Sequence, residues 1–157
     1  MGYQLQSECT QMIRRAVEAD LEVLLAYGEF FWTESPYARK GIEYCKQTVE
    51  RLLRDMIEDH YLIVTTVDNV IVGFLGLLLA QFPFNDDYVV ASELFFYVHP
   101  KHRGSIGSTM MLQAELDLAD EVDILAFGDM SSSTDMKNYY DNRGFEMTER
   151  SYSKVLE

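Results

Sequence analysis

The chain has 157 residues, of which 48% are hydrophobic and 25% are charged, and its formal net charge is −13. This composition is typical of a globular protein with a hydrophobic core and excludes a disordered chain. So acidic a protein repels polyanions, which argues against nucleic acid as a partner and favours cationic partners such as amines. Cys9 and Cys45 match no disulfide or metal pattern and indicate free thiols in a reducing compartment.

The first ten residues and the longest apolar run indicate in which compartment the protein is expected. The first ten residues are polar and lack the basic stretch and apolar core of a secretion signal. The longest apolar run, residues 70–80, is too short to span a bilayer. We therefore expect a cytoplasmic protein without a membrane partner or a metal site. Residues 1–10 would be a lead-in and residues 11–157 a single domain.

Apolar spacing predicts the elements in chain order. The first half begins with a short strand and two helices, expected at residues 11–17, 20–32 and 41–59. A run of three strands follows, expected at residues 61–67, 70–81 and 88–98. The second half continues with a helix, a strand and a short helix, expected at residues 106–121, 122–128 and 136–142. Two closing strands are expected at residues 145–150 and 152–156.

The order β-α-α-β-β-β-α-β-α-β-β predicts the fold class, which is α/β. The consecutive strands in the middle favour antiparallel hairpins, whereas the strand–helix–strand unit over residues 91–128 favours a parallel crossover. We expect a mixed, mostly antiparallel sheet with helices on both faces.

The stretch from Val98 to Ser108, VHPKHRGSIGS, joins a strand to a helix through a glycine- and serine-rich turn. Such a helix start leaves backbone N–H groups unpaired and carries partial positive charge, which suits a phosphate or pyrophosphate. Gly104 and Gly107 would let a ligand approach the backbone closely. An ordinary tight loop capped by Ser105 or Ser108 explains the stretch equally well.

A second informative stretch, residues 138–145, reads NYYDNRGF. Gly144 has the position of a helix C-cap, and Phe145 would begin a strand that enters the core. Packing of a short helix explains at least one of the two tyrosines, Tyr139 and Tyr140.

With both stretches in hand, the chain resembles the GCN5-related N-acetyltransferase (GNAT) superfamily over nearly its whole length. MIRRAVEADLEVL is similar to the first strand and helix of the family, and NVIVGFLGLLL to its second and third strands. VHPKHRGSIGS is similar to the acyl-CoA signature V-x-P-x-x-R-G-x-G-x-G, and YYDNRGF to the closing Y-x-x-x-G-F motif. The size, the Ser-Pro-Tyr segment and the variant glycine loop resemble small phage and prophage members.

Two positions depart from the family pattern. The glycine loop is one residue short between Gly104 and Ile106 and lacks the middle glycine. We expect a backbone nest to remain, with pyrophosphate contacts shifted or weakened. The family often has Asn seven residues before its tyrosine, where this chain has Ser133. A serine hydroxyl there would bond the pantetheine arm or cap the helix.

The resemblance implies that acetyl-CoA binds in a V-shaped opening between the strand ending at Val98 and the strand at 122–128. The pantetheine arm would pair with the backbone of Tyr97 and Val98 like an added strand. The pyrophosphate would lie on a run of six residues: Arg103, Gly104, Ser105, Ile106, Gly107 and Ser108. Arg103 would either contact phosphate or brace the loop.

Acetylation of an amine requires a base for its proton and an acid for the thiolate leaving group. Glu93 is the candidate base, because it stands in an otherwise apolar strand where burial would raise its pKa. A half-exposed glutamate or a structural partner of an arginine is the alternative. Strand alternation puts Glu93, Phe95 and Tyr97 on one face, unless a bulge changes the parity. Tyr140, four residues before Gly144, matches the position of the family's acid.

The resemblance also implies where the acceptor binds. Contacts would come from the first two helices, their connecting loop and the loop before the fourth strand: Phe31, Trp32, Glu34, Ser35, Tyr37, Asp86 and Asp87. Aromatic rings and carboxylates suit a cation. For Phe31 or Trp32, closure of the core is the alternative.

The leading hypothesis is an acetyl-CoA-dependent N-acetyltransferase that acts by direct attack of a primary amine of a small molecule or a protein. A non-catalytic acyl-CoA-binding module for regulation or interaction is the alternative, motivated by the altered loop. A toxin-like enzyme acting on aminoacyl-tRNA is a third reading, which the net charge opposes. The aromatic C-terminal strands could supply the interface of a homodimer.

Overall fold

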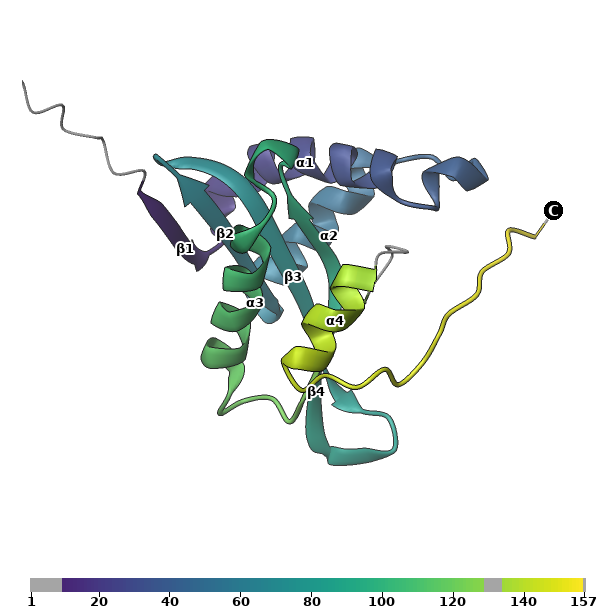
Figure 1. Ribbon diagram of the computed structural model, residues 1–157. Coiled ribbons are helices and arrows are strands. Elements are labelled where there is room, and N and C mark those ends of the chain that lie inside the picture. The colour runs from purple at the N-terminus through teal and green to yellow at the C-terminus, as the bar shows by residue number, and fades with distance from the viewer. Residues whose placement is uncertain (1–9, 129–133, 157) are drawn as a thin grey trace, which may run out of the picture.

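The computed structural model describes residues 10–128 and 134–156 and contains one five-stranded sheet (Figure 1). The strands lie in the order β1-β2-β3-β4-β5, and their bounds are Gln11–Arg15, Tyr61–Val67, Val70–Phe82, Asn85–Val98 and Ile124–Ala126. The first four strands pair antiparallel, and β5 pairs parallel to β4. The mixed, mostly antiparallel sheet of the GNAT type is thereby confirmed.

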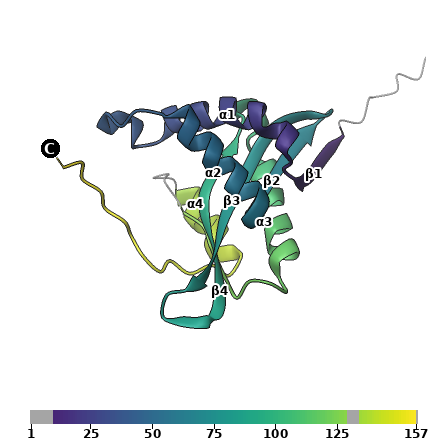
Figure 2. The same ribbon diagram turned by 180° about the vertical axis from the view of Figure 1, so that it is seen from behind.

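Helices cover both faces of this sheet. Helices α1 (Leu21–Glu34) and α2 (Lys46–Asp59) cover one face, which Figure 2 shows in front. Helices α3 (Ser105–Leu118) and α4 (Thr134–Asn142) lie on the other face. Short 3₁₀ turns precede α1, separate α1 from α2 and follow β4. Among the described helices, none has the length and apolar character needed to cross a bilayer.

Helix α2 begins later than its apolar pattern predicts. The expected start was residue 41, but Gly41 has φ 76° and ends the 3₁₀ turn Ala38–Lys40. A left-handed residue stops a helix and favours glycine. Helix α2 therefore begins after Cys45, whose backbone is extended.

Strand β2 explains how two cores form around one sheet. Six successive residues, 61–66, are buried, and successive side chains point to opposite faces. Leu62 and Val64 join the cluster under α1 and α2, whereas Ile63 joins the cluster under α3. Burial of each large apolar side chain contributes roughly 1.5–3 kcal/mol.

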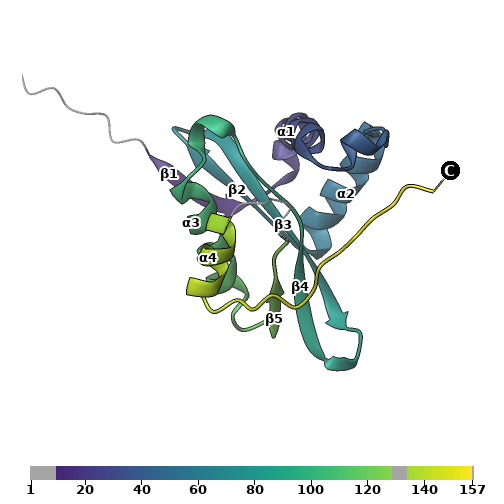
Figure 3. The same cartoon turned by 45° about the vertical axis from the view of Figure 1, so that its right-hand side comes forward.

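The sheet splits between β4 and β5 (Figure 3). Only Val90, Ala91 and Ser92 pair with β5, opposite Ile124, Leu125 and Ala126. Strand β4 continues to Val98 while paired with β3 alone. The predicted V between these two strands is confirmed, and it begins at Glu93.

The two closing strands are not formed, and this part of the predicted order is wrong. Residues 145–156 have no regular secondary structure, and Tyr152 and Leu156 are 91% and 82% exposed. The segment leaves the end of α4 and runs away from the body (Figures 1 and 2). A segment of high strand propensity becomes a strand only where another strand edge pairs with it.

Candidate active site

The loop between β4 and α3 has the geometry of an anion site. Gly104 has φ 128°, a conformation that favours glycine, and α3 begins at the next residue. No side chain caps the start of α3. The hydroxyls of Ser108 and Thr109 instead donate to the carbonyl of Ser105, each at 2.8 Å. The first-turn N–H groups of α3 have no partner within the helix, and a Cβ built at Gly104 would meet no atom within 4 Å, so the space beside this helix start is open.

Arg103 braces this loop. Its Nε donates to the carbonyl of Val98 at 2.9 Å, and its Nη2 donates to both carboxylate oxygens of Glu34 at 2.9 and 2.7 Å. Its guanidinium lies 5.7 Å from the ring centroid of Tyr97. Of the two roles that the sequence leaves open for Arg103, the structure displays the bracing one. Glu34 is engaged in the same ion pair and links α1 to the loop.

A β-bulge at Leu94 sets the direction of Glu93. Gly76 pairs with Phe95, but Leu77 pairs with Glu93, so Leu94 is the extra residue. Cross-strand partners share a face, and Leu77 belongs to the cluster under α3. Glu93 therefore points to the α3 face.

Strand alternation alone would put Glu93, Phe95 and Tyr97 on one face; the bulge, which the sequence left open as the alternative, separates Glu93 from the other two. Phe95 and Tyr97 both pack in the cluster under α1 and α2. The Phe95 ring occupies the place that a Cβ at Gly76 would take, which explains the glycine there. The bulge thus lets β4 send aromatic rings into one core and a carboxylate to the other face.

Glu93 and Tyr140 meet at Gly128, just beyond the end of β5. The N–H of Gly128 donates to Oε2 of Glu93 at 3.1 Å, and its carbonyl accepts from the hydroxyl of Tyr140 at 3.3 Å. Both side chains are half-buried. The structure thus brings the candidate base and the candidate acid together at the mouth of the V.

Gly128 was missed by the sequence reasoning. The sequence signal for it is weak: a single glycine at the end of the strand expected at 122–128, in AFGD. Phe127 was also missed, and its ring stacks on that of Tyr140 at 6.4 Å between centroids.

The end of α4 holds Tyr140 in place. Gly144 has φ 81°, and the N–H of Phe145 donates to the carbonyl of Tyr140 at 3.0 Å, which confirms the predicted helix C-cap. Nη2 of Arg143 contacts both carboxylate oxygens of Glu115 on α3, each at 2.7 Å. The neighbouring hydroxyl of Tyr139 is buried and has no hydrogen-bond partner among residues 10–128 and 134–156, and burial raises the pKa of Tyr139.

The α1–α2 loop brings together only some of the predicted acceptor residues. Phe31 packs against the core, which is the alternative considered for it. The rings of Trp32 and Tyr37 stack at 6.4 Å with an interplanar angle of 13°. Ser35 is buried, and its hydroxyl has no hydrogen-bond partner among the described residues.

Three other predicted residues lie elsewhere. Asp86 and Asp87 stand near the tip of the β3–β4 hairpin, on exposed backbone. Ser133 lies outside the described residues.

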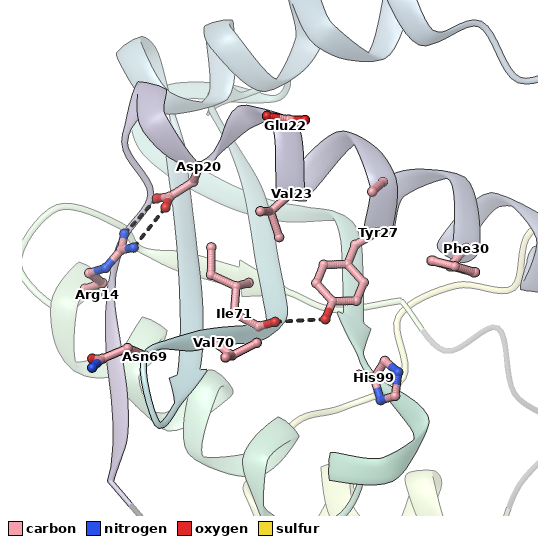
Figure 4. Close-up of a pocket in the computed structure, with 11 residues that line it drawn as sticks. Arg14, Asp20, Glu22, Val23, Tyr27, Phe30, Asn69, Val70, Ile71 and His99 are labelled. Atoms are coloured by element: carbon pink, nitrogen blue, oxygen red, sulfur yellow. Dashed lines mark hydrogen bonds and ion pairs between the residues drawn. The ribbon is translucent and has the colours of Figure 1, made fainter.

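A separate depression of about 770 Å³ lies along α1 and contains none of the predicted site residues (Figure 4). Arg14 and Asp20 form a two-pronged ion pair on its wall, and the hydroxyl of Tyr27 donates to the carbonyl of Ile71 at 2.8 Å. These polar groups satisfy one another. The ion pair joins β1 to the start of α1, and the Tyr27 hydrogen bond joins α1 to β3, so these contacts are structural.

The family model described as the Acetyltransferase (GNAT) family matches residues 21–145. The chain belongs to this family. No curated protein matches the chain.

Solved structures share the GNAT fold at low identity. The chain is similar to a transcriptional regulator from Bacillus halodurans C-125, with 21% identity, TM-score 0.72 and coverage of 94% of this chain and 100% of the other. It is also similar to the aminoglycoside N-acetyltransferase AAC(6')-Iy in complex with CoA, with 16% identity, TM-score 0.72 and coverage of 98% and 99%. A third is a predicted acetyltransferase with acetyl-CoA from Clostridium acetobutylicum, with 18% identity, TM-score 0.67 and coverage of 94% and 97%.

Acetyl-CoA is the cosubstrate of this GNAT protein, and the described residues fit it. The uncapped start of α3 suits an anionic group. The β5-facing edge of β4 has no strand partner beyond Ser92 among the described residues, which suits a chain that pairs like a strand. The start of α3 and the edge of β4 therefore offer an anion site and a strand-pairing edge to the same cosubstrate.

Proposed function

We propose that the protein transfers the acetyl group of acetyl-CoA to a primary amine of a small molecule or a protein, by direct attack of the amine. The observation that carries this proposal is the convergence of Glu93 and Tyr140 on Gly128 at the split of the sheet. A carboxylate and a phenol at one point supply the two proton transfers that amide formation from a thioester needs.

The cosubstrate would lie between the two arms of the V. The backbone of Tyr97 and Val98 would pair with the pantetheine arm, and residues 103–108 would receive the pyrophosphate. Arg103 would hold the backbone N–H groups of residues 103–108 in place through its bonds to Val98 and Glu34. Its main role would therefore be bracing the loop and not contacting the phosphates.

Glu93 and Tyr140 would each transfer one proton during the reaction. Bound acetyl-CoA supplies the acetyl thioester. Glu93 accepts the proton of the attacking amine, directly or through one water molecule. Tyr140 donates its hydroxyl proton to the departing sulfur as the carbon–sulfur bond breaks. Its present bond to Gly128, at 3.3 Å, is longer than the usual 2.7–2.8 Å for hydroxyl donors and is readily exchanged.

The acceptor would be a cation. The net charge of −13 favours approach of an amine. Trp32 and Tyr37 form a stacked aromatic pair on the acceptor loop, and aromatic faces attract cations. Similar structures include aminoglycoside N-acetyltransferases, and aminoglycosides are amine-bearing small molecules. The charge and the aromatic pair suit any cationic amine, and the similarity to aminoglycoside N-acetyltransferases favours a small molecule among them.

The test measures release of CoA thiol from acetyl-CoA with a panel of aminoglycosides, polyamines and lysine peptides. Tyr140→Phe should lower kcat by roughly 10²-fold, the usual contribution of a positioned acid. Tyr139→Phe is the matched control, because it removes a neighbouring hydroxyl that has no hydrogen bond to any described residue and should leave kcat unchanged. Equal rates for the wild type and Tyr140→Phe on an accepted amine would remove the assigned role.

Glu93→Gln separates catalysis from binding. We expect unchanged acetyl-CoA affinity and loss of the acidic limb in the pH profile of kcat/KM, because the variant has no carboxylate to titrate. Saturable acetyl-CoA binding without thiol release from any amine would instead support the non-catalytic binding module.

A further inference from the structure

The depression along α1 has an apolar surface that faces solvent. Its volume of about 770 Å³ falls in the range of roughly 300–1,000 Å³ that is typical of small-molecule sites. Val23 of α1 and the first residues of β3, Val70 and Ile71, form its apolar middle (Figure 4). Phe30 and Val70 are 57% and 61% exposed. Large apolar side chains gathered at such exposure are typical of a surface that a ligand or partner covers.

Glu22 is the uncompensated charge of this depression. Arg14 and Asp20 neutralise each other, with nitrogen–oxygen distances of 2.7 and 2.9 Å. Glu22 is exposed on the α1 side and takes part in no ion pair among residues 10–128 and 134–156. The whole chain has a formal net charge of −13. The local and the overall charge therefore both favour a cation and oppose an anion.

The far end of the depression from the Arg14–Asp20 pair is aromatic. Figure 4 shows the Tyr27 ring pointing from α1 toward β3, with Phe30 further along the helix. The hydroxyl of Tyr27 already donates to the carbonyl of Ile71, so a ligand would meet the ring rather than the hydroxyl. Aromatic rings prefer offset-stacked or edge-to-face contact with another ring. This end therefore suits an aromatic group.

We propose that the depression binds a small aromatic ammonium ion, with its cationic group beside Glu22 and its ring against Tyr27 and Phe30. Glu22 and Tyr27 lie five residues apart on α1, which corresponds to about 7.5 Å along the helix axis. A link of two or three carbons between a ring and an ammonium nitrogen spans such a separation. The apolar middle of the depression would cover that link.

This ligand would be distinct from the acetyl acceptor. The depression lies on the α1 side of the sheet, whereas Glu93 points to the α3 side. The ring of Tyr27 packs on that of Tyr97, at 5.6 Å between centroids, and the guanidinium of Arg103 lies 5.7 Å from the Tyr97 centroid. The ligand would therefore lie behind the contacts that brace the cosubstrate loop and would bind together with acetyl-CoA.

The first test titrates the isotope-labelled full chain of 18.2 kDa with phenethyltrimethylammonium and follows the backbone amide shifts by NMR. This probe has no N–H and cannot be acetylated, so the result does not depend on the proposed transfer reaction. We expect saturable shifts centred on residues 22–30 and 69–71, with a dissociation constant on the order of a millimolar, with and without saturating acetyl-CoA.

The matched anion in this test is hydrocinnamate, which has the same ring and two-carbon link but a carboxylate. It should produce no saturable shifts, because the depression has a negative rim. Three results would each overturn the proposal: no saturable shift with the cation, equal affinity for cation and anion, or displacement of the cation by acetyl-CoA. Shifts centred on Trp32 and Tyr37 would overturn it as well and would place the probe on the acceptor loop.

The second test changes the charge at Ala26, which lines the depression and is exposed on α1. Ala26→Lys and Ala26→Gln introduce side chains of similar length and helix propensity, so they differ mainly in charge. We expect the lysine variant to bind the probe about fivefold or more weakly than the glutamine variant. Its ammonium repels the probe and also pairs with Glu22, four residues earlier. Equal affinity of the two variants would refute the assigned site.

Glu22→Gln tests the partner of the ammonium group. This variant should bind the probe roughly two- to fivefold more weakly, the usual scale of an exposed ion pair. Glu29→Gln is the control, because Glu29 is an exposed glutamate of α1 that does not line the depression. It should keep the wild-type affinity. Equal losses in the two variants would show a general effect of net charge and would overturn the placement of the ammonium group.

Discussion

The two halves of the sheet are built for different tasks. Strands β1 to β3 lie between helices, and β2 has six consecutive buried residues. Strands β4 and β5 share only three paired positions, and the residues of β5 are half-buried or exposed. Where backbone groups are all paired, the sheet supplies stability. Where pairing stops, free N–H and C=O groups and reachable side chains become available to ligands.

The β-bulge at Leu94 joins the two regions. Before the bulge, Ala91 packs under α3; after it, Phe95 packs under α1 and α2. One extra residue therefore changes which alternate side chains of β4 face each core, and Glu93 faces Gly128. Bulges are frequent beside active sites for this reason.

The largest effect on stability is expected in the first half. Leu75→Ala removes a fully buried side chain from the centre of β3 and should lower the free energy of unfolding by about 2–5 kcal/mol. Urea denaturation measures the loss. Turnover per folded molecule should stay at the wild-type value, because Leu75 lies in the helix-covered half. A fall in kcat without a loss of stability would contradict the claim that this half of the sheet supplies stability and the other half the active site.

A smaller effect with a pH signature is expected at Asp20. This carboxylate is buried, and its hydrogen bonds from Arg14, at 2.7 and 2.9 Å, lower the pKa of Asp20. A lowered native pKa adds stability above the unfolded pKa of about 3.9, and that stability is lost as the pH falls through the native pKa. Asp20→Asn should cost roughly 1.5–3 kcal/mol at pH 7.

The difference between wild type and Asp20→Asn should then shrink below pH 4. Urea denaturation across pH 3–8 measures it, with the exposed Glu22→Gln as the control. If the difference in unfolding free energy did not change with pH, the Arg14–Asp20 contact would stabilise the protein through shape and not through charge.

The smallest effect is expected where the two halves touch. Arg103 and Glu34 are each about half exposed, so Glu34→Gln should cost only about 0.2–1 kcal/mol of stability. Because the pair links the end of α1, where we propose that the amine binds, to the loop that we propose receives the pyrophosphate, the KM for the amine should rise more than kcat falls. Steady-state kinetics with both substrates separate the two. A stability loss above about 2 kcal/mol would show that the pair belongs to the core instead.

Most of the first half could be predicted from local pattern. Residues 61–67 were predicted as a strand with the bounds that the structure gives, because continuous apolar β-branched sequence at that length is a strong signal. The direction of Glu93 could not be predicted, because a bulge changes parity without a sequence marker of its own. The meeting of Glu93 and Tyr140 at Gly128 depends on tertiary placement of α4.

The closing strands show the opposite failure. Residues 145–150 and 152–156 have strand composition, but composition does not supply a partner edge. Arg103 likewise left two roles open from sequence, and only the position of Glu34 on α1 shows the bracing one. The resemblance to small phage-type members stays a prediction.

Acetyl-CoA binding by calorimetry, with the wild type beside Gly107→Glu and Gly107→Gln, tests the central claim most directly. Gly107 lies in the first turn of α3, and a Cβ there meets the side chain of Phe96 at 3.2 Å, equally in both variants. The two variants therefore differ in charge alone. The account predicts saturable binding by the wild type, retained binding by Gly107→Gln, and an affinity lower by about tenfold or more for Gly107→Glu, because its carboxylate opposes the pyrophosphate. Equal affinity of the two variants, or no wild-type binding near millimolar acetyl-CoA, would contradict the placement of the cosubstrate at the split of the sheet.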